Sequence, residues 1–185
     1  MSLKIQSVSR TRIIAFFAFM GIFSAAYQLG SMSEVSEEEA DAFMGEFEEL
    51  IEGIDGMGIF LHNTSIALPM FLPGFGIAWG LFSATATGYA FAAIVLLMPE
   101  LSQIPPLAIL YLSPFGLMEL VAYSTATSRS YILIWAIIKK TSLRTLAIPT
   151  AAEVGIVVGL LLAGGFLEHY MINLAMEEGL TMPGL

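Results

Sequence analysis

Apolar runs recur along this sequence, and they constrain its fold more than any other feature. A helix needs about 20 apolar residues to cross a hydrocarbon core of about 30 Å. Such runs occupy residues 13–29, 58–98, 107–121, 131–138 and 147–167. The chain is 57% hydrophobic and 12% charged, whereas roughly 25% of residues are charged in a typical soluble domain. The sequence therefore predicts an all-α fold, a polytopic bundle of transmembrane helices.

The first apolar run has two interpretations. It follows the basic residues between Lys4 and Arg12 and contains small residues near Ser24, a pattern that is also typical of a cleavable signal peptide. The run continues to Leu29 and so reaches spanning length. We interpret it as a retained first transmembrane helix.

Charged residues divide between two sides of the predicted membrane domain. All seven basic residues fall in two clusters, one from Lys4 to Arg12 and one from Arg129 to Arg144, and positively charged segments stay on the cytoplasmic side. Fourteen of the sixteen acidic residues lie in segments that would face the other way; the exceptions are Glu119 and Glu153. This pattern predicts a multi-pass cell-membrane protein with a cytoplasmic N-terminus and an extracytoplasmic C-terminus.

An odd number of crossings satisfies this charge pattern, and we expect about five. Residues 1–12 would form the cytoplasmic N-terminus, residues 13–172 a single transmembrane domain and residues 173–185 an external tail. The breaker cluster Pro73-Gly74-Phe75-Gly76 predicts the turn between the second and third spans. The expected spans are residues 13–30, 58–73, 76–98, 107–128 and 148–168.

An acidic amphipathic helix is expected outside the membrane over residues 36–55. Ser36 and Glu39 have the spacing of a capping box, and apolar residues recur at helical spacing, namely Phe43, Phe47, Leu50 and Ile54. The helix could pack this apolar stripe on its own bundle or present a docking surface to a partner. Its acidic character argues against nucleic acid and anionic lipid head groups as its ligands.

Two ridges of small residues predict close helix packing. Small residues repeat at every fourth position, first as Gly76, Gly80, Ala84 and Gly88 and then as Ala151, Gly155, Gly159 and Ala163. Such ridges let helix backbones approach one another in a membrane. We expect both ridges to be tightly packed, either within the chain or against a second copy of it.

The segment from Leu107 to Lys140 is too long for one straight crossing. A continuous helix of that length would extend on the order of 50 Å, so the segment must break or bend. Pro114 removes a backbone donor and clashes with the preceding turn, and Gly116 adds flexibility. The sequence therefore predicts a broken helix near residues 113–116, lined by protein or by a water-filled cavity.

Glu119 follows this break and is expected near the middle of the membrane. An ionisable side chain within a span is a functional candidate because its insertion is costly. It could bind a cation, relay a proton, cap the broken helix or hydrogen-bond a neighbouring helix when protonated. With a span over residues 107–128, Arg129 would mark the inner rim and residues 131–140 would lie along the interface. We prefer this arrangement to a span over residues 117–138, which would bury Arg129.

Four short stretches resemble the stage II sporulation protein M family of small integral membrane proteins, over about residues 58–171. The resemblance implies a family core of Asn63 in IFLHNTSIAL, Gly88 in TGYAFAAI, Pro114, Gly116 and Glu119 in SPFGLMEL, and Glu168 in GGFLEHY. The family usually has histidine at the position of Phe115 and asparagine at the position of Thr87, so roles of those two residues are not carried over.

The resemblance implies a non-enzymatic membrane subunit. In sporulating bacteria the family's member belongs to a membrane-anchored complex with peptidoglycan hydrolases that drives engulfment. We therefore expect an accessory or scaffold subunit that contacts the lipid bilayer and other membrane-protein subunits or a second copy of itself, and no nucleic acid. The alternative is a small channel or transporter-like protein that uses the broken helix and Glu119 as an ion or proton site.

No enzymatic activity and no cofactor are expected. The sequence contains no cysteine and none of the common zinc-peptidase, serine-hydrolase or phosphate-loop motifs, and Glu119 has no expected acidic partner at its depth. Asn63 and Glu168 are expected to meet at the outer leaflet, with His62, Glu168 and His169 as weak candidates for a metal site. Adjacent helical residues point about 100° apart, so polar contacts between helices are the favoured role.

Overall fold

The structure, a computed structural model, describes residues 10–51 and 53–177, and the side chains of residues 10–45 and 53–174. All regular elements in this part of the chain are helical, as predicted. They are α1 (Arg10–Ser31), α2 (Glu37–Ile51), α3 (Gly56–Ala67), the 3-10 turn η1 (Leu68–Phe71), α4 (Phe75–Leu97), the 3-10 turn η2 (Pro99–Gln103), α5 (Pro106–Leu112), α6 (Pro114–Ile138) and α7 (Arg144–Glu177).

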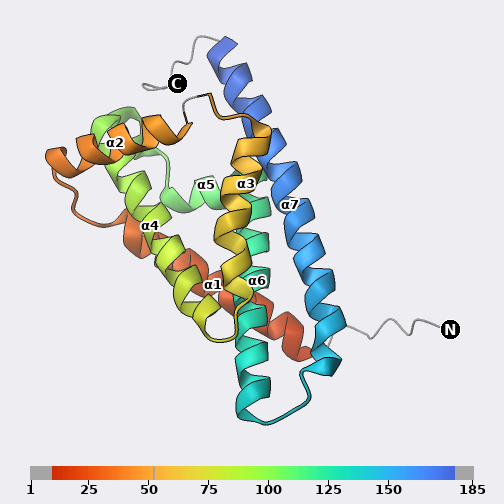
Figure 1. Cartoon of the computed structure of the whole chain (residues 1–185). Coiled ribbons are helices and arrows are strands. Elements are labelled where there is room, and N and C mark those ends of the chain that lie inside the picture. Colours follow the sequence, from red (N-terminus) through yellow and green to blue (C-terminus); the bar gives the residue numbers. More distant parts are fainter. Residues whose placement is uncertain (1–9, 52, 178–185) are drawn as a thin grey trace.

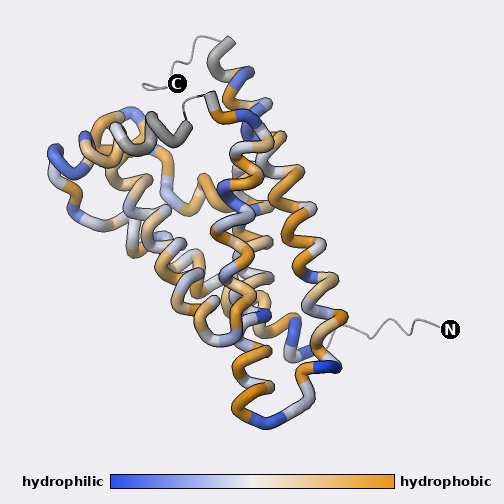
Figure 2. Tube along the Cα trace, in the orientation of Figure 1, coloured by the Kyte–Doolittle hydropathy of each residue, from blue (hydrophilic) through white to orange (hydrophobic). Residues whose placement is uncertain are grey.

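The long helices run in alternate directions, and charged residues gather at the two ends of the bundle (Figures 1 and 2). One end, called here the basic end, holds the start of α1, the α3–α4 turn and the α6–α7 loop, with Arg10, Lys139, Lys140 and Arg144. The opposite, acidic end holds α2 and the loop before α3. The separation of charges expected from the sequence is thus present in the described chain.

The acidic helix α2 begins as predicted and ends earlier. The Ser36 backbone N–H donates to Glu39 Oε2 at 2.9 Å, and the Glu39 N–H donates to Ser36 Oγ at 3.3 Å, which completes the capping box. The helix stops at Ile51, and Asp55 instead caps α3 by accepting from the Gly58 N–H at 2.8 Å. The side chains of Phe47 and Leu50 lie outside the described residues, so the apolar stripe stays a prediction.

The turn between α3 and α4 lies where the breaker cluster predicted it. The 3-10 turn η1 ends at Phe71, and α4 begins at Phe75. Gly74 has φ of 78°, a left-handed conformation that glycine adopts without the steric cost of a Cβ atom. The Pro73-Gly74 pair therefore reverses the chain within a few residues.

The first small-residue ridge packs tightly within the chain. Gly76, Gly80, Ala84 and Gly88 are all buried on α4. A Cβ atom on Gly80 would lie 2.1 Å from Thr127 Cγ2 of α6, and one on Gly88 would lie 2.0 Å from the Tyr27 carbonyl oxygen of α1. The ridge therefore allows α4 to approach both α1 and α6.

The second ridge does not pack within the chain, which leaves the alternative of packing against a second copy as a prediction. Its members Ala151, Gly155, Gly159 and Ala163 are exposed on α7, and a Cβ atom on Gly155 or Gly159 would have no neighbour within 4 Å. The face of α7 that points inward carries Val157, Leu161 and Gly165 instead. Helices α7 and α3 come close together at Gly165, because a Cβ atom there would lie 2.9 Å from the Phe60 nitrogen of α3.

The broken helix is present where the sequence predicted it. Helices α5 and α6 meet at an angle of 88° at Ser113, and α6 continues to Ile138 without interruption. No single straight helix covers residues 107–128, and residues 131–138 continue α6. The place of these residues relative to the membrane stays a prediction. Pro114 sits at the first turn of α6, where a missing N–H costs little, so the proline starts a new helix and does not merely kink a long one.

Three described helices are each long and apolar enough to cross a membrane: α1, α4 and residues 144–174 of α7. The bent pair α5–α6 passes the same test only when taken together, which gives at most four. Helix α3 has 12 residues, so the count of five is not confirmed. Helix α7 extends to Glu177, which makes the start of the expected tail helical, and residues 1–9 and 178–185 lie outside the described range.

Candidate functional site: two polar clusters along helix α6

Helix α6 carries an unusual density of buried polar side chains. Its inward residues include Ser124, Thr125, Thr127, Ser128, Arg129 and Ser130. Hydroxyl groups bond back to the helix, as Thr127 Oγ1 does to the Tyr123 carbonyl, and Ser130 Oγ donates to the Leu72 carbonyl of the α3–α4 turn at 2.6 Å. Such bonds satisfy hydroxyls away from water, so α6 can place polar groups at the centre of the bundle.

The first cluster, called here the carboxylate cluster, consists of Asn63, Glu119, Tyr123 and Glu168. Asn63 is buried on α3, and its Nδ2 donates to Glu119 Oε1 at 2.6 Å. Glu168 of α7 lies near enough for its charge to act on Glu119 and Tyr123. Three helices that are distant in sequence therefore meet through polar side chains.

This arrangement corrects the expected depth of Glu119. We expected Asn63 and Glu168 at one membrane face and Glu119 near the middle, without an acidic partner. Because α5 turns aside by 88°, α6 begins at Pro114 and Glu119 lies in its second turn, level with the other two. Glu119 therefore has an acidic neighbour, Glu168, which we did not expect.

The residues at the break hold α5 against α6. Ser113 Oγ accepts from the Gly116 N–H at 3.1 Å and donates to the Ile109 carbonyl at 2.6 Å. A Cβ atom on Gly116 would lie 2.5 Å from that carbonyl oxygen. Pro114 and Gly116 are thus explained by the geometry of the break, and Gly88 by the crossing of α4 with α1.

The weak metal candidates do not come together. Within the described residues, no three His, Asp or Glu side chains are grouped so that they could hold a metal ion. The ring of His169 contacts the Asn173 amide at 3.1 Å, and His62 is exposed on α3. Adjacent residues on each helix point in different directions, so His62 and His169 do not follow Asn63 and Glu168 into the carboxylate cluster.

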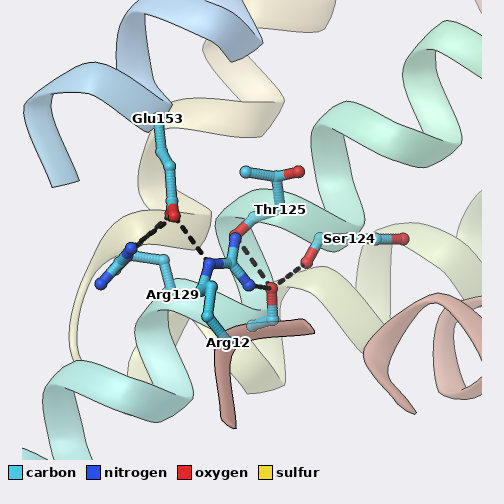
Figure 3. A network of polar contacts seen from close by, with 6 residues as sticks. Arg12, Ser124, Thr125, Arg129 and Glu153 are labelled. Carbon is cyan, nitrogen blue, oxygen red and sulfur yellow. Dashed lines mark hydrogen bonds and ion pairs between the residues drawn. The ribbon is translucent and has the colours of Figure 1, made fainter. Parts of the chain in front are cut away.

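A second cluster, called here the Arg-Glu-Arg network, was not foreseen (Figure 3). Glu153 of α7 accepts from Arg12 Nε of α1 at 2.6 Å and from Arg129 Nε of α6 at 2.7 Å, and it also accepts from Arg129 Nη2. Arg12 Nη1 donates to Ser128 Oγ at 2.7 Å, and Arg12 Nη2 donates to the Thr125 carbonyl at 3.2 Å. The network joins α1, α6 and α7.

The network also explains why Arg129 is buried, with 4% of its side chain exposed. A buried charge needs a partner that replaces its lost hydration. The Glu153 carboxylate is such a partner for both the Arg12 and the Arg129 guanidinium groups. The sequence held a signal for this contact, because Glu153 is one of two acidic residues outside the acidic segments and lies among the basic ones.

These features define a multi-pass helical membrane protein whose helices are joined by polar side-chain contacts. The sequence model described as stage II sporulation protein M matches residues 13–171. The chain therefore belongs to this family, as the short motifs indicated. Comparisons with curated proteins and with solved structures gave no match.

Proposed function

We propose that this protein is a non-enzymatic accessory or scaffold subunit of a larger membrane complex. The observation that carries the proposal is the uncovered face of α7. Only 11% of the most apolar stretch of α7 is buried, against 28% for α1 and for α4. The small-residue ridge on this face, Ala151, Gly155, Gly159 and Ala163, is suited to close approach of another helix.

The interior of the bundle supports a structural role. The Asn63–Glu119 bond ties α3 to α6, and the Arg-Glu-Arg network ties α1 to α6 and α7. Bonded polar groups fix helices in one arrangement, which a scaffold requires. The partner in this proposal is another membrane-protein subunit or a second copy of the chain, and the acidic helix α2 is a further contact surface on the acidic end.

The same proposal includes five crossings with the basic end in the cytoplasm. Helix α3 and η1 together have 16 residues and rise about 26 Å, close to a hydrocarbon core of about 30 Å. With α3 counted, α1, α3, α4, α6 and α7 alternate in direction (Figure 1). Basic residues at one end favour that end inside, which leaves the N-terminus cytoplasmic and the C-terminus extracytoplasmic.

Purification of the tagged protein from native membranes in mild detergent tests the scaffold role. We expect stoichiometric proteins, or a second copy, to copurify with the wild type and to be lost from Gly159→Leu, which fills the ridge. Gly21→Leu is the matched control, because Gly21 is also an open glycine on a spanning helix, here α1. A monomeric particle without partners, or equal recovery of partners with both variants, would contradict the proposal.

The alternative function is an ion or proton site in a small channel or transporter-like protein. It is favoured by the meeting of Glu119, Glu168 and Asn63 beside the helix break, since ionisable groups within spans often mark ion pathways. Flux into proteoliposomes across an imposed ion or pH gradient would test it. Loss of flux in Glu119→Gln, with folding intact, would favour this alternative over the scaffold.

A further inference from the structure

A pocket of about 260 Å³ lies beside the Arg-Glu-Arg network, between α1, α6 and α7. Its polar side is formed by Arg12, Thr125 and Glu153. Its other side is apolar and includes Ile13, Phe17 and Ile156. The pocket therefore has one charged side and one apolar side. Such a pocket suits a ligand that has a charged head group and an apolar chain.

The apolar side of the pocket opens outward from the bundle. Ile13, Phe17 and Ile156 are 47%, 63% and 58% exposed. They lie on α1 and α7, two helices that are long and apolar enough to cross a membrane. In a bilayer these side chains would face lipid acyl chains, so an amphipathic ligand could enter sideways from the lipid.

The charges at the polar side favour an anion. Two guanidinium groups share one carboxylate in the network, and arginine keeps its charge at any physiological pH. A guanidinium group recognises phosphate oxygens through planar paired donors, so a phosphate would balance the network better than a neutral head group.

The position of the pocket agrees with this assignment. Its α1 residues lie between Arg12 and Phe17, in the first two turns of a helix that begins at the basic end (Figure 1). The exposed residues Arg10, Lys139, Lys140 and Arg144 are at the same end, and Lys139 lies 5.0 Å from the ring centre of Trp135. Basic residues next to spanning helices attract anionic lipids, and basic pockets between helices bind their head groups.

We propose that this pocket binds an anionic phospholipid from the leaflet at the basic end. The lipid phosphate contacts Arg12, and an acyl chain lies along Ile13, Phe17 and Ile156. None of the residues that line the pocket belongs to the α7 ridge or to the carboxylate cluster.

Native mass spectrometry and thermal unfolding of the full chain in mild detergent test this proposal. The probes are phosphatidylglycerol, phosphatidylcholine with the same acyl chains, and inorganic phosphate. We expect phosphatidylglycerol to stay bound and to raise the unfolding temperature, with at least about tenfold tighter binding than phosphatidylcholine, the size of effect that one charged hydrogen bond supplies. Inorganic phosphate should not reproduce the effect, because it lacks the acyl chains.

Two variants separate the site from general stability. Arg12→Gln removes the phosphate contact, and Ile156→Trp fills the apolar side without touching the ion pairs; both should lose the tenfold preference. Ile148→Trp is the matched control, because Ile148 is an exposed isoleucine on α7 outside the pocket. Equal binding of the two lipids, an equal effect of inorganic phosphate, or an unchanged preference in Ile156→Trp would overturn the proposal.

Discussion

Replacement of Gly88 by alanine should separate α4 from α1. The new Cβ atom would lie 2.0 Å from the Tyr27 carbonyl oxygen and 2.8 Å from the Ser31 nitrogen, both backbone atoms of α1. Ordinary contacts of this kind are about 3.5 Å, so the two helices must move apart by about 1 Å or more. No side-chain rotation can relieve a clash with backbone.

The size of the effect follows from two opposing terms. Overpacking of this kind costs about 1–3 kcal/mol, and alanine gains back up to about 1 kcal/mol in helix propensity. Because both clashing atoms are backbone, we expect the upper part of the range and a net loss of about 2 kcal/mol. Gly159→Ala on α7 meets no atom within 4 Å and should instead gain up to about 1 kcal/mol.

Reversible unfolding in mixed dodecyl maltoside and dodecyl sulfate micelles, followed by circular dichroism, measures this difference. The two alanine variants should differ by about 3 kcal/mol in opposite directions from the wild type. Equal stability of Gly88→Ala and Gly159→Ala would refute the claim that only the first ridge packs within the chain.

Three further predictions concern the polar contacts and the helix starts. Glu153→Gln should cost about 3 kcal/mol or more, because it leaves two guanidinium groups without their carboxylate, and Arg12→Gln should cost less because one ion pair is kept; the same micelle unfolding ranks them, and the reverse order would be inconsistent with the network. Ser113→Ala should cost about 1 kcal/mol through loss of the α6 cap, and Ser113→Asp should restore most of it in that assay; no loss in the alanine variant would show that the cap is dispensable. Hydrogen bonds from Ser36 hold the pKa of Glu39 below its usual value, so their support of α2 is complete above the unfolded pKa and is lost as pH falls through the folded pKa. The protection of α2 amides, measured against the intrinsic exchange rate at each pH, should therefore fall more on acidification in the wild type than in Glu39→Gln, and identical protection profiles would contradict this.

Local chemistry made several parts of the fold predictable. The capping box at Ser36, the turn at Pro73-Gly74 and the break at Pro114 depend on backbone rules that act over a few residues. The sequence therefore indicated where helices begin and end in these places. The close packing of the first ridge was also predicted, from four small residues on one face of α4.

The sequence did not predict which side of each helix is buried in the bundle. Both ridges have the same spacing, yet only the α4 ridge is covered, because neighbouring helices decide which face of α7 points inward. Glu119 lies level with Asn63 and Glu168 because α5 and α6 meet at a sharp angle at Ser113. The spacing of residues along the chain does not predict that angle. The contact between Arg12 and Glu153 joins residues 141 positions apart, and it depends on the packing of the whole bundle.

Photo-crosslinking in native membranes tests the scaffold role most directly. A photoreactive benzoylphenylalanine placed at position 159 would sample the uncovered face of α7, and the same group at position 21 of α1 is the matched control. We expect a discrete protein adduct at position 159, either with another membrane subunit or with a second copy of the chain, and none at position 21. Lipid adducts alone at position 159, or the same protein adducts at both positions, would contradict it.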